Sequence, residues 1–268
     1  MVREGGFEAN GVVTLTTDFG TIDGYVGAMK GVILARFEQA RVLDLSHDIA
    51  PQDIRTASHT LANACPYFPP GTVHVAVIDP GVGTRRAIIA ALAYGQLFLA
   101  PDNGVLSNVI GCNSPAWRLE RDDLNLPNVS RTFHGRDILA PTAAALAAGL
   151  LAPEELGPPH EPRRLPDPKV ATGPGYVRGE VIAIDRFGNL VTNVTIETLP
   201  AGAALGNLRV DFKEQTISGI SWSYADVEVG QWLAVVGSKD TIELSVREGS
   251  AAGRTGARIG DPVKIQRM

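Results

Sequence analysis

A proline-rich segment divides this chain into two parts with different patterns of predicted secondary structure. Prolines recur from Pro153 to Pro174 without apolar periodicity, which is typical of a linker. Before this segment β-rich and helical stretches alternate, whereas after it short β-rich stretches follow one another. The chain of 268 residues is also longer than a usual single domain. We therefore expect an α/β domain at 1–165, a linker at 166–175 and an all-β domain at 176–268.

Alternating elements in the first part predict a layered α/β domain with a central, mostly parallel sheet. The strands are expected at 12–16, 41–45, 72–78, 87–92 and 97–100, and the helices at 25–37, 53–67 and 138–150. Short strands without a convincing helix predict a small β-barrel or sandwich in the second part. These strands are expected at 179–184, 190–195, 208–212, 232–236, 242–246 and 262–265, with a helical turn at 250–254.

Charge and composition exclude several classes of partner. The net charge is −5 without a long basic run, which argues against a nucleic-acid partner. Residues 1–10 are polar and acidic, and the sequence contains no run of about 18 apolar residues, so we expect no membrane association and a cytoplasmic protein.

Cysteine and histidine positions give no sign of a metal site or a disulfide. Cys65 and Cys112 stand in unlike contexts, and we expect both to be buried. His47 begins an acidic loop without a third ligand at a suitable spacing, so we expect it in a solvated turn. His59 and His74 lie inside a predicted helix and strand, where histidines are more often packed or at the surface than ligands.

An apolar run that ends in a carboxylate gives the clearest sign of a functional site. Residues 72–78 predict a buried strand, and the next residues are Asp79-Pro80-Gly81-Val82-Gly83-Thr84-Arg85-Arg86. Open α/β sheets bind their ligands at the carboxyl ends of strands. Asp-Pro-Gly is also ordinary turn chemistry, so this motif alone leaves both a site and a plain turn open.

Two further loops repeat the pattern of a strand followed by acids. The predicted strand at 12–16 leads to Asp18 and Asp23, and the strand at 179–184 leads to Asp185 and Asn189. Carboxylates at strand ends can accept paired hydrogen bonds from vicinal hydroxyls or from an ammonium group. The three loops together indicate a ribose-bearing or amino-acid-like ligand.

Four ordered motifs resemble those of the S-adenosyl-L-methionine hydroxide adenosyltransferases, relatives of the fluorinase and chlorinase enzymes. The resemblance covers nearly the whole chain, and the motifs are Thr17-Asp18-Phe19-Gly20, Asp79-Pro80-Gly81-Val82-Gly83-Thr84, Thr132-Phe133-His134-Gly135-Arg136-Asp137 and Asp185-Arg186-Phe187-Gly188-Asn189. It implies a hydrolase that cleaves S-adenosyl-L-methionine to adenosine and L-methionine without a cofactor or a metal. It also implies an α/β domain followed by a β-barrel, and a homotrimer with the active site at the subunit interface.

By this resemblance, Asp79, Arg86 and His134 are the catalytic residues that position and polarise water. Asp79 stands where the halogenases have a tyrosine, and a carboxylate would repel a halide but can accept a proton from water. The sequence leaves open whether Asp79 or His134 takes the proton, and whether Arg85 or Arg86 is the catalytic guanidinium. A chlorinase-like halogenase and a non-catalytic sensor of S-adenosyl-L-methionine or adenosine remain alternatives.

The resemblance also assigns the substrate contacts. Asp18 corresponds to the carboxylate that binds the ribose hydroxyls, and Asp23 to one that receives the methionine ammonium. Tyr25 stands where the fluorinase has a serine near the methionine carboxylate. The remaining predicted contacts are Phe133, the methionine-amine contact Asp185, the lining ring of Phe187, the adenine contact Asn189, and the loop that contains Ser250 and Ala251.

Overall fold

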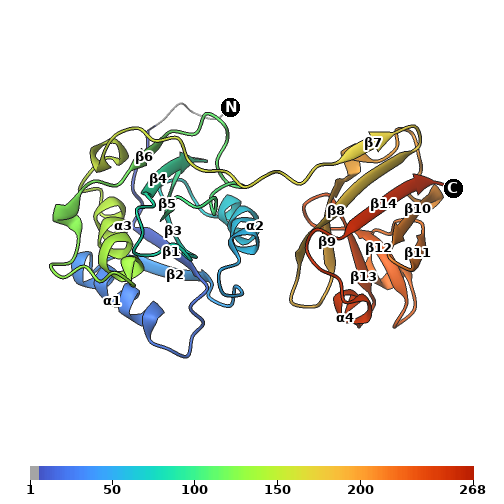
Figure 1. Ribbon diagram of the computed structural model, residues 1–268, viewed down its shortest axis with the longest axis horizontal. Helices are drawn as coiled ribbons and strands as arrows, with labels where there is room; N and C mark the ends of the chain where they lie inside the picture. Colours follow the sequence, from blue (N-terminus) through green and yellow to red (C-terminus); the bar gives the residue numbers. More distant parts are fainter. Residues whose placement is uncertain (1–5) are drawn as a thin grey trace. The chain divides into compact units, whose positions relative to one another are not determined.

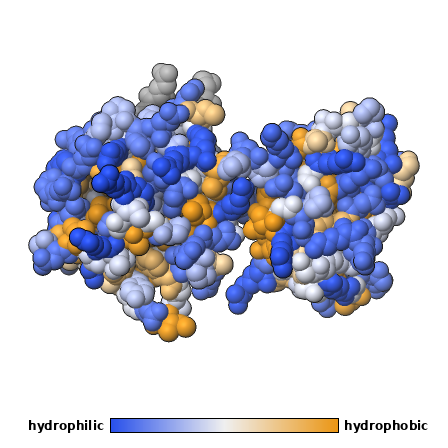
Figure 2. Space-filling model, viewed as in Figure 1, coloured by the Kyte–Doolittle hydropathy of each residue, from blue (hydrophilic) through white to orange (hydrophobic). Residues whose placement is uncertain are grey.

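The computed structural model describes residues 6–268, and these form two compact units that meet in the chain between Leu165 and Pro166. Figure 1 shows helices beside a sheet in the first unit and mainly strands in the second. Hydrophilic residues make up most of the face seen in Figure 2, with apolar patches between them. Within the described residues, no helix combines the length and the apolar character needed to cross a membrane.

A six-stranded sheet with the order β2-β1-β3-β5-β4-β6 forms the centre of the first unit. Strands β2, β1, β3 and β5 are parallel to their neighbours, and β4 is antiparallel to both β5 and β6. The elements are β1 (Val12–Thr17), β2 (Arg41–Ser46), β3 (Val73–Val77), β4 (Ile88–Ala93), β5 (Gln96–Pro101), β6 (Ala116–Arg118), α1 (Tyr25–Arg36), α2 (Ile54–Ala64) and α3 (Ala140–Ala147). This mostly parallel sheet confirms the predicted fold class.

Two apolar layers cover the two faces of this sheet. On one face, α1 and α3 pack against β1 and β3 through residues such as Met29, Leu15 and Val75. On the other face, α2 contributes Leu61, which packs with Phe98 of β5. Strands buried on both faces read as continuous apolar runs, which is why the sequence pattern located β3 and β5.

An eight-stranded antiparallel sheet forms the second unit. Its order is β11-β10-β14-β8-β9-β13-β12, with β7 paired to β8. A bridge between Ser221 and Val235 links the segment after β11 to β12, so the sheet nearly closes into the expected barrel. The elements are β7 (Ala171–Gly173), β8 (Tyr176–Ile184), β9 (Leu190–Thr195), β10 (Leu208–Phe212), β11 (Gln215–Ser218), β12 (Trp232–Val236), β13 (Thr241–Val246), β14 (Pro262–Arg267) and α4 (Ala251–Thr255).

Several details differ from the sequence-based expectations, and strands β6 and β11 have no counterpart among the expected strands. Strand β7 lies within the segment assigned to the linker, because its backbone pairs with β8. Helical structure begins at Gly135 rather than 138. Cys112 is exposed, whereas Cys65 is buried as expected. His47 is buried rather than solvated, because its ring nitrogens contact Thr17 Oγ1 at 2.8 Å and Asp44 Oδ1 at 2.9 Å.

Candidate active site

Parallel pairing of β1 with β3 brings two of the acidic loops to the same edge of the sheet. Thr17 pairs with Val77, so the chain leaves both strands at the same level. Asp18 follows β1 directly, and Asp79 follows β3 after Ile78. Because the carboxyl ends of parallel strands share one edge, these two carboxylates belong to one region of the α/β unit.

Arg86 joins Asp79 and His134 in a single hydrogen-bonded chain. Its Nε donates to both carboxylate oxygens of Asp79 at 2.8 Å, and its Nη2 donates to Oδ2 as well. The same Nη2 lies 3.0 Å from Nδ1 of His134. The side chains of Arg86 and Asp79 are 9% and 6% exposed, so water screens this ion pair only weakly.

The loop after β3 turns back on itself, and this turn brings Arg86 rather than Arg85 to Asp79. Backbone N–H groups of Val82 and Thr84 donate to the carbonyls of Asp79 and Gly81. Gly83 has a φ of +77°, and a Cβ there would stand 2.5 Å from the carbonyl oxygen of Arg131. The turn returns Arg86 to Asp79, whereas Arg85 is exposed.

The contact with Arg86 fixes the protonation state of His134. A guanidinium can only donate hydrogen bonds, so Nδ1 of His134 accepts and the neutral ring carries its proton on Nε2. Burial lowers the pKa of His134, and the charge of Arg86 lowers it further against the opposing effects of Asp79 and Asp137. His134 is therefore a neutral hydrogen-bond donor at Nε2 in this arrangement.

Gly135 brings His134 close to the end of β3. A Cβ on Gly135 would lie 3.1 Å from Val77 Cγ1 and 3.2 Å from Met29 Sδ, so a larger residue would have to displace these side chains by a few tenths of an ångström. His134 precedes a π-helical turn, η3 (Gly135–Leu139), that leads into α3. In this turn Asp137 is buried and accepts from Arg136 Nε at 2.6 Å and from the Ser130 N–H at 2.7 Å, which fixes the loop before His134.

Three aromatic rings gather beside this chain of polar groups. Phe19, Tyr25 and Phe133 pack edge to face, with ring centroids 5.3–5.8 Å apart. Tyr25 remains 49% exposed and Asp23 is exposed. Asp18 accepts the backbone N–H of Gln52 at 2.8 Å, which orients its carboxylate. The α/β unit thus brings the predicted residues Asp18, Tyr25 and Phe133 into the neighbourhood of the catalytic candidates.

The β unit has its own pocket of about 830 Å³, which contains four of the five residues predicted there. Asp185, Phe187, Asn189 and Ser250 line it, whereas Ala251 is fully buried in the core. The Phe187 ring is 77% exposed. Ser250 Oγ caps α4 by accepting the N–H of Gly253 at 2.9 Å.

Asp185 holds the loop between β8 and β9. Its Oδ1 accepts the backbone N–H groups of Phe187 at 2.9 Å and Asn189 at 2.8 Å, and its Oδ2 accepts Asn189 Nδ2 at 2.8 Å. A carboxylate offers about four acceptor positions, so one remains for a ligand. The same loop packs on α4, because Gly188 accepts the N–H of Ala252 at 2.9 Å.

Sequence reasoning missed Tyr224, which lines the same pocket. Its hydroxyl donates to Glu243 Oε2 at 3.2 Å, so the orientation of the ring is fixed by a residue of β13. Burial raises the pKa of Glu243, and the charge of Asp185 adds to this effect. Tyr224 stands in a short 3₁₀ turn without a recognisable motif, so no pattern in the sequence marked it. Across residues 6–268, no cluster of three or more His, Cys, Asp or Glu side chains could hold a metal ion.

Comparison with known families identifies this arrangement. Residues 13–157 match the SAM hydroxide adenosyltransferase N-terminal domain, and residues 179–264 match the C-terminal domain of the same family. The chain belongs to the SAM hydroxide adenosyltransferase family. These matches include the loops that contain Asp18, Asp79, His134 and Asp185.

Individual relatives are similar over almost their full length. An (R)-S-adenosyl-L-methionine hydrolase of Salinispora tropica is 38% identical over 263 residues, which cover 94% of this chain and 97% of the relative. A hydrolase of the same name from Thermus thermophilus is 37% identical over 262 residues, or 94% of this chain and 98% of the relative. A fluorinase of Actinopolyspora mzabensis is 26% identical over 291 residues, or 96% and 97% of the two chains.

A solved structure has the same fold. The crystal structure of an uncharacterized conserved protein from Thermotoga maritima has a TM-score of 0.87 to this chain at 33% identity. The match covers 95% of this chain and 100% of that one.

Proposed function

We propose that this protein hydrolyses S-adenosyl-L-methionine to adenosine and L-methionine by in-line attack of water at C5′. The chain of hydrogen bonds from Asp79 through Arg86 to His134 supports this proposal most directly. It places a carboxylate, a guanidinium and a neutral imidazole at the edge of the sheet where α/β proteins bind ligands. The relatives named as hydrolases, at 37–38% identity, support the same reaction.

The reaction needs little beyond alignment and a protected site. The C5′–S bond breaks, and its electron pair stays on sulfur, which turns the sulfonium into the neutral thioether of methionine. The water oxygen forms the new bond to C5′ and loses one proton. Because the sulfonium is already a good leaving group, an oriented nucleophile in a preorganised pocket supplies most of the required catalysis.

We infer that Asp79 rather than His134 takes the proton of water. His134 Nδ1 faces a donor and Nε2 already carries a proton, so neither nitrogen can accept another without a rearrangement. Asp79 accepts three hydrogen bonds from Arg86, so one of its four acceptor positions remains for water. Arg86 orients the carboxylate of Asp79, and His134 contacts the guanidinium from its other side.

Substrate recognition follows from the remaining carboxylates and rings. Asp18 binds the ribose hydroxyls and Asp23 the methionine ammonium, while Tyr25 and Phe133 exclude bulk water. In the β unit Asp185 offers its fourth acceptor position to the ammonium group, Asn189 and Phe187 contact adenine, and Ser250 borders the base; the fully buried Ala251 cannot contact it. Residues of the two units then form one site between subunits of a homotrimer.

Product analysis tests the proposed function. The purified protein is incubated with S-adenosyl-L-methionine in chloride buffer, and the products are separated by chromatography. Hydrolysis yields adenosine and methionine, whereas a halogenase yields 5′-chlorodeoxyadenosine and a sensor leaves the bound ligand unchanged. Asp79→Asn should lose turnover while calorimetry shows that the ligand still binds; a variant that loses only affinity would remove Asp79 from the chemistry.

A further inference from the structure

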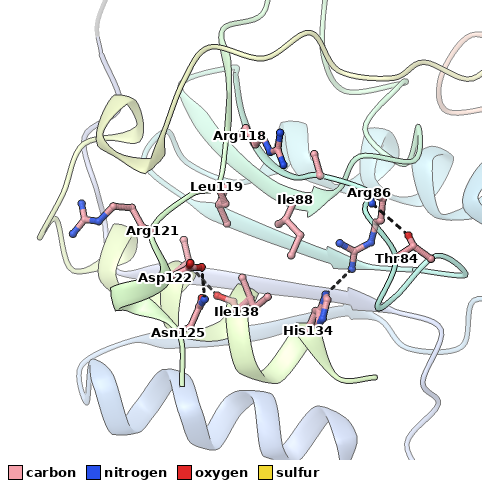
Figure 3. A pocket seen from close by; sticks show the side chains of 12 residues that line it. Thr84, Arg86, Ile88, Arg118, Leu119, Arg121, Asp122, Asn125, His134 and Ile138 are labelled. Atoms are coloured by element: carbon pink, nitrogen blue, oxygen red, sulfur yellow. Dashed lines mark hydrogen bonds between the residues drawn. The ribbon is translucent and has the colours of Figure 1, made fainter. Parts of the chain in front are cut away.

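A second cavity of the α/β unit reaches Arg86 and His134 from a different side. We call it the lateral pocket; its volume is about 160 Å³. Figure 3 shows Arg86 and His134 pointing toward one another at one end, and Asp122 bonded to Asn125 at the other. The lining residues are Thr84, Arg86, Ala87, Ile88, Arg118, Leu119, Arg121, Asp122, Asn125, His134, Ile138 and Thr142.

The lining separates this pocket from substrate recognition. Of the residues proposed to contact substrate or water, only Arg86 and His134 line it. The carboxylates of Asp18 and Asp23 and the rings of Tyr25 and Phe133 do not. A bound nucleoside would therefore not enter the lateral pocket. Arg86 and His134 would still contact whatever the pocket contains.

The charges around the pocket favour water over an anion. Arg86 is paired with Asp79, Arg121 with Asp123 at 2.8 Å, and Arg118 approaches Glu120 at 3.6 Å. Asp122 adds a further negative charge to the lining. Because each guanidinium already faces a carboxylate, the pocket has no excess of positive charge to hold an anion.

Polar groups along the pocket suit a short chain of water molecules. A buried water needs about two to four polar partners and roughly 30 Å³ of space, so the cavity has room for several. The hydroxyls of Thr84 and Thr142 donate to the Gly81 and Ile138 carbonyls; Thr84 Oγ1 also accepts the N–H of Arg86 at 3.4 Å, and each hydroxyl has a further acceptor position. The side chain of Asn125, together with His134, adds further partners.

From this arrangement we propose that the lateral pocket supplies water to Arg86 and His134, past which it reaches Asp79 as the nucleophile, while the substrate occupies its own face. The inference rests on the proposed hydrolysis. Aromatic rings border the substrate side, so binding there displaces water. The separate, polar lateral pocket keeps water available for the attack. Leu119 and Ile138 then set how much water reaches the catalytic chain.

Filling the pocket tests this inference. Leu119→Phe places a larger side chain in the cavity, and we expect kcat to fall by at least about tenfold because the water is displaced. The dissociation constant for S-adenosyl-L-methionine, measured by calorimetry, should stay within about twofold because no substrate contact changes. Ile138→Phe fills the pocket from η3 and should have the same effect if Leu119→Phe folds poorly.

Two further variants separate occlusion from lost packing. Leu119→Ala removes the same packing but leaves the cavity open, so it should lose less kcat than Leu119→Phe. Leu150→Phe makes the same exchange at an exposed leucine outside the pocket and should match the wild type. Equal losses in Leu119→Phe and Leu119→Ala, or unchanged kcat in both filled variants, would overturn the inference. Wild-type protein that forms no adenosine would instead overturn the proposed function.

Discussion

At the level of single residues, the proposed mechanism depends on which arginine pairs with Asp79. Sequence could not decide between Arg85 and Arg86, because the two are adjacent and chemically equal. In the structure the turn at Gly83 brings Arg86 to Asp79, which depends on the path of the backbone. The protonation of His134 follows only from its contact with Arg86 Nη2, a contact between residues 48 positions apart.

A pair of matched substitutions tests the choice of arginine. Lysine keeps the positive charge but loses the planar fork, so Arg86→Lys cannot contact Asp79 and His134 together. We expect kcat to fall by about 100- to 1000-fold, comparable to the loss of a key electrostatic donor. Arg85→Lys should retain nearly full turnover in the same assay. The reverse ranking would show that Arg85 is the catalytic guanidinium.

At the scale of elements, long regular strands were predictable and short ones were not. Strands β9 and β10 have the bounds expected from their sequences, and their buried and less buried residues alternate with a period of two. Strands β6 and β7 have three residues each and no such period. The helical start at Gly135 was missed because the packing of Gly135 on Val77 overrides its low helix propensity.

Glycine substitutions test the turn that delivers Arg86. Gly83→Ala forces a side chain into a left-handed backbone 2.5 Å from a carbonyl oxygen, so we expect a loss of at least about 1–2 kcal/mol in unfolding free energy together with reduced kcat. Gly27→Ala adds the same methyl group in α1 with nothing within 4 Å, and should gain about 0.5–1 kcal/mol. Denaturant unfolding measures both. A harmless Gly83→Ala would mean that the turn does not position Arg86.

His74 in β3 makes stability depend on pH. Burial lowers its pKa from 6.5 to about 4, an effect that the Gln96 side chain opposes only in part. The ring stacks on Phe98, with 4.8 Å between the ring centroids, and Nδ1 lies 2.7 Å from Thr14 Oγ1. As pH falls, His74 of the unfolded chain binds a proton before His74 of the folded chain does. The contribution of neutral His74 to the unfolding free energy is therefore complete above pH 6.5 and is lost toward pH 4.

Denaturant titrations at several pH values measure this contribution. Between pH 6.5 and 4 the wild type should lose about 3 kcal/mol more unfolding free energy than His74→Gln, whose amide does not titrate. Above pH 7 the difference between the two proteins should be constant. If the unfolding free energies of the two proteins ran parallel throughout the acid range, the pKa of His74 would be the same in the folded and the unfolded chain.

At the scale of the whole molecule, the sequence predicted an α/β fold and a barrel because each has its own pattern of periodicity. What it could not supply was the gathering of Phe19, Tyr25 and Phe133 or the place of Tyr224, since these depend on tertiary packing. Asp79 and His134 belong to one unit and Asn189 to the other. Our proposal that neighbouring subunits share each site therefore needs a test of its own.

Complementation between inactive chains provides that test. His134→Ala and Asn189→Ala are each expected to be inactive or nearly so. After dissociation and reassembly of a mixture, some sites draw both intact halves from different chains, and activity should partly return. Light scattering confirms that the oligomer has re-formed. A mixture as inactive as its components, in an intact oligomer, would place both halves of the site within one chain.

Oxygen-isotope labelling tests whether water attacks C5′. The enzyme is allowed to turn over S-adenosyl-L-methionine in water enriched in oxygen-18, and both products are analysed by mass spectrometry. Attack of water at C5′ predicts that the 5′-hydroxyl of adenosine contains the heavy oxygen and that methionine contains none. Unlabelled adenosine, or a product in which sulfur stays bonded to C5′, would contradict the account.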